Sequence, residues 1–225
     1  MTADRPHVLL VEDDAAIRET TALLLQTHGF DVCVSADGQT GIDDFRAGRF
    51  DVALLDVMLP RIDGISLARL IRETSAIPIV LLSARSEPFD MVAGLEAGAD
   101  DYVAKPFDGP VLAARLRAVL RRAGRHDAGG ERLLRADGLE VDPAGMSARV
   151  GGEPVALTTT EARLLIELAR NVGIVMNRAT LLERVWDYRW DGDTRLVDVH
   201  VQRLRAKIGR ERIETVRGAG YKLVG

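Results

Sequence analysis

The first 120 residues alternate between short apolar runs and longer segments of helical periodicity. The short runs are rich in Val, Ile and Leu and predict buried strands at residues 7–11, 30–34, 52–55, 77–82 and 102–103. The segments that follow repeat apolar residues every three or four positions, which predicts helices at residues 15–28, 37–47, 65–71, 87–97 and 111–120. Five strands alternating with five helices predict an α/β fold with a doubly wound parallel sheet.

The second half of the chain is organised differently. Residues 122–132 are polar, contain glycines and lack periodicity, which indicates a linker. Residues 133–157 alternate apolar and polar positions in short bursts separated by turn residues, which predicts an antiparallel meander of small strands. The pattern therefore divides the chain into a first domain at 1–121, a linker at 122–132 and a second domain at 133–225.

Three helices are predicted after the meander. Thr158 and Glu161 form the capping box of the first helix, and Asn177 is the expected N-cap of the second. The third helix is expected at residues 194–208, where an apolar stripe recurs at helical spacing: Val197, Val201, Leu204 and Ile208. Together with a hairpin expected at residues 213–223, these helices predict an α+β winged helix-turn-helix domain.

Composition adds a division of charge. Residues 1–120 carry 11 Lys and Arg against 19 Asp and Glu, a net charge of −8, whereas residues 121–225 carry 19 against 15, a net charge of +4. An acidic half joined to a basic half suggests two tasks, the second involving a polyanion. Cys33 is the only cysteine, which excludes an internal disulfide and a zinc site built from cysteines. Because no apolar run could span a membrane and no secretory leader is evident, we expect a cytoplasmic protein without membrane contact.

Acidic residues follow two of the predicted parallel strands in the first domain. Glu12 and Asp13 come directly after the first strand, and Asp56 comes after the third. The carboxyl ends of parallel strands meet at one edge of the sheet, where α/β proteins bind their ligands. Carboxylates gathered there repel one another, so the site favours a divalent cation. Mg²⁺ suits it, because that ion binds one or two carboxylates and leaves positions for water and phosphate oxygens.

Ser83 and Lys105 follow the fourth and fifth strands. Lys105 would place a compact positive charge against phosphoryl oxygens, and Ser83 would donate a hydrogen bond to the same group. Asp56 could then act as the nucleophile that accepts a phosphoryl group and forms an acyl phosphate. Each residue alone is commonly a turn residue, a helix cap or a surface charge, and only their combination at successive strand ends favours phosphoryl chemistry.

The motifs VEDD, LLDVMLP, LLSAR, GADDY and KPF resemble, in sequence and spacing, the receiver domain of two-component response regulators over residues 7–120. The resemblance implies a (βα)5 flavodoxin-like fold in which Asp56 accepts phosphate from a sensor histidine kinase. It implies that Mg²⁺ is held by Asp13, Asp56 and the backbone carbonyl of Met58, with Glu12 nearby.

Two further features of the receiver follow from the same resemblance. Ser83 and Tyr102 are expected to be the switch pair that responds to phosphorylation. The peptide bond between Lys105 and Pro106 is expected to be cis, which agrees with the near-confinement of cis bonds to proline.

The third helix of the second domain carries cations opposite its apolar stripe. We expect this outer face to hold Arg195, His200, Arg203 and Lys207, with Arg205 on the flank. Only Asp198 offsets these cations between Arg195 and Arg210, which favours contact with phosphates.

The run VDVHVQRLRAKIG followed by ETVRGAGYKL resembles the OmpR/PhoB class of response regulators, whose third helix enters the major groove and whose hairpin wing reaches the minor groove. Matching positions make Arg203 the best candidate for reading a base, because arginine bonds guanine bidentately. The other expected DNA contacts are phosphate-holding residues on the helix and residues of the wing: Arg195, His200, Arg205 and Lys207, then Thr215 and Arg217. Gln202 stands where an Arg is sometimes found, so the target preference need not match that of better-known relatives.

The resemblance also implies that phosphorylation pairs two receivers through the fourth helix, fifth strand and fifth helix. Two charged pairs and one apolar pair are expected on this dimer face: Asp101 with Arg115, Asp100 with Arg122, and Met91 with Val111. The paired molecules would then occupy direct-repeat promoter DNA, with RNA polymerase as a further partner.

The sequence thus predicts a phosphorylation-dependent transcription regulator that is not itself an enzyme. A hydrolase using an aspartyl nucleophile is disfavoured, because Met58, two residues after Asp56, cannot serve as a proton donor. The remaining alternative is an atypical regulator that binds DNA independently of phosphorylation, against which the intact acidic cluster and Lys105 count.

Overall fold

The computed structural model describes residues 5–83, 88–124, 133–187 and 193–225. The chain forms two compact units, Met1–Arg121 and Arg122–Gly225. Most of the predicted linker at 122–132 lies outside the described residues.

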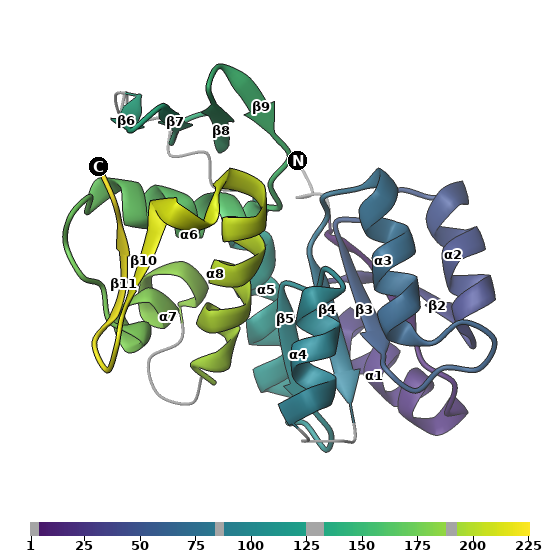
Figure 1. Ribbon diagram of the computed structural model, residues 1–225. Helices are drawn as coiled ribbons and strands as arrows, with labels where there is room; N and C mark the ends of the chain where they lie inside the picture. Colours follow the sequence, from purple (N-terminus) through teal and green to yellow (C-terminus); the bar gives the residue numbers. More distant parts are fainter. Residues whose placement is uncertain (1–4, 84–87, 125–132, 188–192) are drawn as a thin grey trace. The chain divides into compact units, whose positions relative to one another are not determined.

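A five-stranded parallel sheet forms the centre of the first unit (Figure 1). Its strands follow the order β2-β1-β3-β4-β5, and their bounds are β1 (His7–Val11), β2 (Asp31–Ser35), β3 (Val52–Asp56), β4 (Ile79–Ser83) and β5 (Asp101–Ala104). The doubly wound prediction is confirmed. The fifth strand begins one residue earlier than predicted, because the backbone of Asp101 pairs with that of Val80 in β4. The carboxylate of Asp101 is buried beside Arg115, 3.8 Å away.

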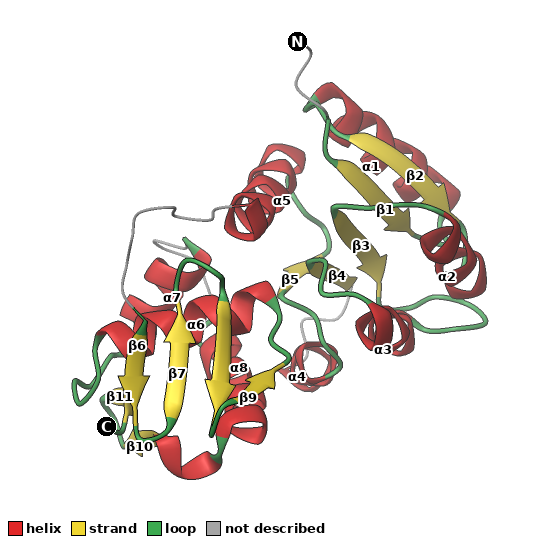
Figure 2. Cartoon of the chain, turned by 90° about the horizontal axis from the view of Figure 1, so that it is seen from above, coloured by secondary structure: helices red, strands yellow, loops and turns green. Residues whose placement is uncertain are grey.

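Helices cover both faces of this sheet, α1 and α5 on one face and α2, α3 and α4 on the other (Figure 2). Their bounds are α1 (Ala15–Thr27), α2 (Gly38–Ala47), α3 (Gly64–Thr74), α4 (Pro88–Glu96) and α5 (Gly109–Gly124). Alternate strand residues such as Leu10 and Leu54 pack against Leu25 of α1 and Leu116 of α5. Burying both faces of the strands explains their nearly unbroken apolar sequences.

Aspartates begin four of these helices. Asp14, Asp37 and Asp63 each accept the backbone N–H of the residue three positions later at 2.9 Å, and Asp108 accepts that of Val111 at 3.1 Å. Hydrogen bonding to Thr40 lowers the pKa of Asp37 below its ordinary value. These caps satisfy amide groups that the first helical turn leaves unpaired, and they direct each chain out of the preceding loop.

The second unit begins with an antiparallel meander in the order β6-β7-β8-β9, which confirms the predicted short strands. Three helices and a hairpin follow (Figure 1). The bounds are β6 (Leu134–Ala136), β7 (Leu139–Asp142), β8 (Ser147–Val150), β9 (Glu153–Val155), α6 (Thr159–Arg170), α7 (Arg178–Trp186), α8 (Arg195–Ile208), β10 (Ile213–Val216) and β11 (Gly220–Leu223), with a 3-10 turn at Arg210–Arg212.

The core of the second unit lies where α8 meets α6 and α7. The predicted apolar stripe of α8 is buried as expected, and Leu196 and Val199 are buried with it. The Thr158 capping box and the Asn177 cap are both present. The winged helix-turn-helix prediction is confirmed.

No helix among the described residues is both long enough and apolar enough to cross a bilayer.

Gly220 shows how closely the hairpin packs against the loop that precedes α7. Its φ is +147°, and a Cβ at this position would lie 2.0 Å from the backbone oxygen of Met176. Gly218, in the turn of the same hairpin, has a φ of +72°, and no described heavy atom beyond its chain neighbours lies within 4 Å of a Cβ added there. A side chain at Gly220 would therefore clash with rigid backbone. A side chain at Gly218 would clash with nothing in the described part of the chain and would cost only the strain of a positive φ.

We predict that Gly220→Ala lowers the unfolding free energy of the second unit by about 3 kcal/mol or more, and that Gly218→Ala lowers it by about 1 kcal/mol. Both tryptophans, Trp186 and Trp190, belong to this unit, so tryptophan fluorescence during urea unfolding reports on it alone. Equal losses for the two variants would contradict the packing argument.

Candidate functional site

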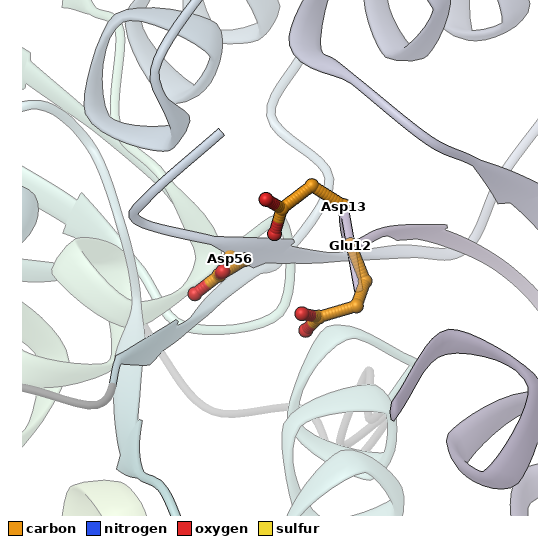
Figure 3. Close-up of side chains that lie close together, drawn as sticks. All are labelled: Glu12, Asp13 and Asp56. Atoms are coloured by element: carbon orange, nitrogen blue, oxygen red, sulfur yellow. The ribbon is translucent and has the colours of Figure 1, made fainter. Parts of the chain in front are cut away.

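Three carboxylates converge at the carboxyl ends of β1 and β3 (Figure 3). One oxygen from each of Glu12, Asp13 and Asp56 lies within 4.8 Å of the others. The parallel pairing of Val11 with Leu55 brings the two strand ends side by side. Glu12 and Asp56 are only 1% and 5% exposed, whereas Asp13 is exposed to solvent. The predicted acidic cluster is therefore present.

Lys105 is the cation of this cluster. Its Nζ lies 2.6 Å from Glu12 Oε2 and 3.2 Å from Asp56 Oδ2, at the end of β5. The peptide bond from Lys105 to Pro106 is cis, as predicted. Burial raises the pKa of Glu12, the hydrogen bond from Lys105 opposes that shift, and the charge of Asp56 adds to it.

The cluster meets the requirements of a magnesium site. Three carboxylates against one ammonium group leave an excess of negative charge, and oxygen donors are the ligands that Mg²⁺ prefers. The buried Oδ1 of Asp56 has no hydrogen-bond partner among the described residues. An unpaired buried oxygen is costly, and a cation or a phosphoryl group would compensate it.

The expected switch residues, Ser83 and Tyr102, and the expected third metal ligand, the carbonyl of Met58, come from β4, β5 and the segment after β3. Ser83 is fully buried at the end of β4, and its carbonyl accepts the backbone N–H of Lys105 at 2.7 Å. Tyr102 is half-buried in β5. The side chain of Met58 is 54% exposed. The switch role of Ser83 and Tyr102, and the metal contact of the Met58 carbonyl, stay predictions.

An open apolar groove of about 540 Å³ runs beside Lys105. It is lined by α1 and by the loop after β5, through Ala16, Ile17, Thr20, Thr21, Lys105, Pro106 and Phe107. The groove and the acidic cluster therefore share one residue, Lys105.

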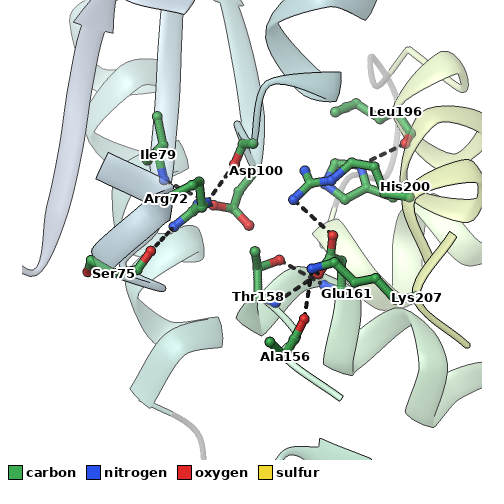
Figure 4. A network of polar contacts seen from close by, with 12 residues as sticks. Arg72, Ser75, Ile79, Asp100, Ala156, Thr158, Glu161, Leu196, His200 and Lys207 are labelled. Atoms are coloured by element: carbon green, nitrogen blue, oxygen red, sulfur yellow. Dashed lines mark hydrogen bonds and ion pairs between the residues drawn. The ribbon is translucent and has the colours of Figure 1, made fainter. Parts of the chain in front are cut away.

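Several residues expected on a dimer face are engaged within the chain. Asp100 is 1% exposed, forms an ion pair with Arg72 of α3 and accepts the backbone N–H of Ile79 at 3.0 Å (Figure 4). Its expected pairing with Arg122 stays a prediction, because the side chain of Arg122 lies outside the described part of the chain.

The other residues expected on the dimer face differ in how far they are buried. Asp101 is buried beside Arg115, 3.8 Å away, and Met91 is buried as well, so neither is exposed in the single chain, and their place on a dimer face stays a prediction. Val111 is 50% exposed near the start of α5. The sequence pattern did not show this difference in burial, because it does not reveal which side chains the neighbouring elements cover.

His200 does not face outward as predicted. It is fully buried, its Nδ1 lies 2.9 Å from the carbonyl oxygen of Leu196, and its ring meets the indole of Trp186 edge-on with centroids 5.0 Å apart. The expectation that His200 contacts phosphate is therefore wrong. The physical reason is that α7 covers a wider arc of α8 than the apolar stripe alone indicated.

Two predicted DNA contacts on α8, Arg203 and Lys207, are bound to a buried carboxylate, and their contact with DNA stays a prediction. Glu161 of α6 is 0% exposed, and its oxygens lie 2.8 Å from Arg203 Nη2 and 2.6 Å from Lys207 Nζ. Lys207 also donates to the carbonyl of Ala156 at 2.8 Å (Figure 4). The sequence identified Glu161 only as a capping residue, which it also is. It carried no signal that α8 would supply the counter-charges.

A second polar network joins α8 to the hairpin and α7. Asp198 accepts from Arg178 Nε at 2.6 Å and from the Tyr221 hydroxyl at 2.7 Å. The guanidinium of Arg205 lies 5.6 Å from the centre of the Tyr221 ring, and it donates to the Ile213 carbonyl and to Thr215 Oγ1, the latter at 2.7 Å. Burial and the hydrogen bond to Asp198 raise the pKa of Tyr221, so its hydroxyl remains a donor.

The remaining cations of the expected interface are closer to solvent. Arg217 is exposed in the turn between β10 and β11. Arg195 forms an ion pair with Asp193, and this hydrogen-bonded partner lowers the pKa of Asp193.

Family comparisons agree with this division of the chain. Residues 8–117 match the family described as response regulator receiver domain, and residues 152–223 match the family described as transcriptional regulatory protein, C terminal. The chain is 59% identical to the transcriptional regulatory protein CseB of Streptomyces coelicolor, over 98% of this chain and 99% of that protein. It is 45% identical to the DNA-binding response regulator MtrA of Mycobacterium tuberculosis, over 99% of this chain and 98% of that protein.

Solved structures show the same similarity over the whole chain. A mutant of the protein RitR matches with a TM-score of 0.75 and 28% identity, covering 97% of this chain and 98% of that one. Response regulator DrrB of Thermotoga maritima, described as an OmpR/PhoB homolog, matches with a TM-score of 0.53 and 32% identity, covering 99% of this chain and 100% of that one.

We predict that Arg203→Met lowers the unfolding free energy of the second unit by about 3 kcal/mol, because it leaves a buried carboxylate with only one counter-charge. Adding Glu161→Gln to that variant should recover part of the loss. Arg217→Ala, at an exposed turn, is the matched control and should change stability by less than about 0.5 kcal/mol. Fluorescence-monitored urea unfolding is the measurement, and an Arg203→Met variant as stable as its parent would show that the ion pair contributes nothing.

Proposed function

The chain belongs to the OmpR/PhoB family of two-component response regulators, and from this we propose that a sensor histidine kinase phosphorylates Asp56 and thereby controls promoter binding by the second unit. The observation that supports the proposal best is the acidic cluster of Glu12, Asp13 and Asp56, in which Lys105 is bonded to the two buried members, Glu12 and Asp56. A surface carboxylate would need no such arrangement, whereas a phosphoryl acceptor needs both a cation site and a fixed positive charge.

In this proposal, Asp13, Asp56, the carbonyl of Met58 and the nearby Glu12 hold Mg²⁺. When bound, the ion would neutralise charge on the phosphoryl oxygens. A carboxylate oxygen of Asp56 forms the bond to phosphorus as the bond from phosphorus to the donor nitrogen of the kinase histidine breaks, and the electron pair of that bond leaves with the histidine. Lys105 then offsets the charge of the new acyl phosphate.

The neighbouring side chains have supporting roles in the proposal. The buried Ser83 is positioned at the adjoining strand end to donate its hydroxyl to the phosphoryl group, and Tyr102 is its partner in the switch. The groove beside Lys105 is the proposed contact for the kinase, because it borders the acidic cluster and exposes Ile17 on α1.

We predict that Asp56→Asn abolishes labelling by acetyl phosphate and leaves the fold intact, because the amide cannot attack phosphorus. Asp51→Asn is the matched control: the residue precedes the same strand at its other end and is exposed. Intact-mass measurement with Mg²⁺ should show one added phosphoryl group on the parent and on the control, and none after magnesium is chelated. Undiminished labelling of Asp56→Asn would refute the assignment.

DNA binding by the second unit is proposed to place α8 in the major groove and the β10–β11 hairpin against the minor groove. Arg195, Arg217 and Thr215 are the proposed contacts to the DNA backbone, and Arg205 orients the hairpin as well as adding positive charge. RNA polymerase is the proposed further partner at the promoter. If Asp56→Asn bound promoter DNA as tightly as the phosphorylated parent, the alternative of a phosphorylation-independent regulator would hold instead.

Dimerisation through the α4-β5-α5 face is proposed to place two DNA-binding units on direct repeats. Of the residues expected on that face, Val111 is the exposed apolar one. Apolar contact is not screened by salt, so it would persist where ion pairs weaken.

We predict that Val111→Glu prevents dimerisation of the phosphorylated protein. Val34→Glu is the matched control, because Val34 is 46% exposed against 50% for Val111 but lies on β2, at the opposite edge of the sheet. Sedimentation velocity after acetyl phosphate treatment should give dimers for the parent and the control, and monomers for Val111→Glu. A fully dimeric Val111 variant would exclude α5 from the interface.

A further inference from the structure

Most charged side chains of α8 already have partners within the second unit. Glu161 engages Arg203 and Lys207, and Asp193 engages Arg195. Arg205 donates to the carbonyl of Ile213 in the hairpin. A cation that is paired in this way is poorly suited to reading a base, because its existing ion pairs or hydrogen bonds must break first.

Gln202 differs from these charged residues because it has no partner in the described part of the chain. It is exposed on α8, and among the described residues its side chain makes no hydrogen bond or ion pair. The other exposed positions of the helix are Ala206, which has no polar group, and Lys207, which is bonded to Glu161. Gln202 therefore presents the one exposed, uncommitted polar side chain in the described length of α8.

The position of Gln202 on the helix also faces the hairpin side. Asp198, Gln202 and Arg205 follow one another at spacings of four and three, so they share one face of α8. Asp198 is bonded to Tyr221 of β11, and Arg205 is bonded to Thr215 of β10. Gln202 thus lies between the two residues that tie the helix to the wing, on the face that would meet DNA together with it.

We propose that Gln202, and not Arg203, is the principal base-reading residue of this protein, and that its ligand is the major-groove edge of adenine. This inference rests on the proposed DNA-binding function. The glutamine amide offers one acceptor and two donors, which match the N6 donor and the N7 acceptor of adenine. An arginine reader would select guanine instead, because it has donors only.

Arg203 is a positioning residue in this view. Its guanidinium is mostly buried, and its partner Glu161 is wholly removed from water. Turning Arg203 toward a base would leave the carboxylate of Glu161 with a single counter-charge, and the cost of an imperfectly paired buried charge exceeds the gain from one base contact. Arg203 and Lys207 hold α8 against α6, and Gln202 is left to select the sequence.

The test is selection of bound duplexes from a pool with a randomised segment, using full-length protein phosphorylated with acetyl phosphate. Four proteins are compared: the parent, Gln202→Ala, Gln202→Arg and Arg203→Lys. The last variant keeps the charge beside Glu161 but loses the planar fork that reads guanine, so it separates base reading from folding.

We expect the parent to enrich a repeated motif with an adenine that Gln202→Ala no longer selects, at a cost of roughly tenfold in discrimination at that position. Gln202→Arg should change the preferred base there to guanine, and Arg203→Lys should leave the motif unchanged. An unchanged motif with Gln202→Ala, a position that is not adenine, or a motif altered by Arg203→Lys would each overturn the inference while leaving DNA binding in place. A parent that enriches no sequence would overturn sequence-specific binding itself, and the inference with it.

Discussion

Glu12 and Asp56 are almost completely removed from water, and one ammonium group, that of Lys105, is bonded to both. Ionised carboxylates are costly to bury unless a counter-charge accompanies them. The topology of the receiver unit supplies this counter-charge. Because β1, β3 and β5 are parallel strands of one sheet, their carboxyl ends bring Glu12, Asp56 and Lys105 to the same edge of the sheet. With Asp13 beside them, negative charge still exceeds positive charge. That excess of negative charge makes the edge of the sheet compatible with a bound Mg²⁺ ion.

The same constraint organises the second unit. Glu161 is buried at the start of α6, where it caps the helix, and it is neutralised by Arg203 and Lys207 of α8. Helix α8 is therefore positioned by cations that its sequence alone would assign to DNA contact. Asp198 and Arg205 tie the opposite flank of α8 to the hairpin through Tyr221 and Thr215. The two elements proposed to contact DNA, α8 and the hairpin, are held in a fixed relation by polar contacts on both sides of the helix.

Membership of a family establishes the fold of a chain more securely than it establishes the role of any single residue. The relatives show that the chain is a response regulator with a receiver and a DNA-binding domain. They do not show which cation on α8 is committed internally, because that depends on whether a buried acid stands opposite. Asp100 illustrates the point in the receiver, where its partner is Arg72 of the same unit.

The sequence by itself determined the five alternating strands and helices, the meander, the caps at Asp14, Thr158 and Asn177, and the gathering of Glu12, Asp13, Asp56 and Lys105. Periodicity and capping are local properties, and the edge at which parallel strands end follows from their direction alone. Only the tertiary structure decided the partners of charged side chains: Arg72 and Asp100 are 28 residues apart, and Glu161 and Lys207 are 46 residues apart. His200 was misplaced for the same reason, because a polar residue beside an apolar stripe has the same pattern whether it meets water or the indole of Trp186. The physical difference lies in the surface opposite the helix, and that surface comes from another part of the chain.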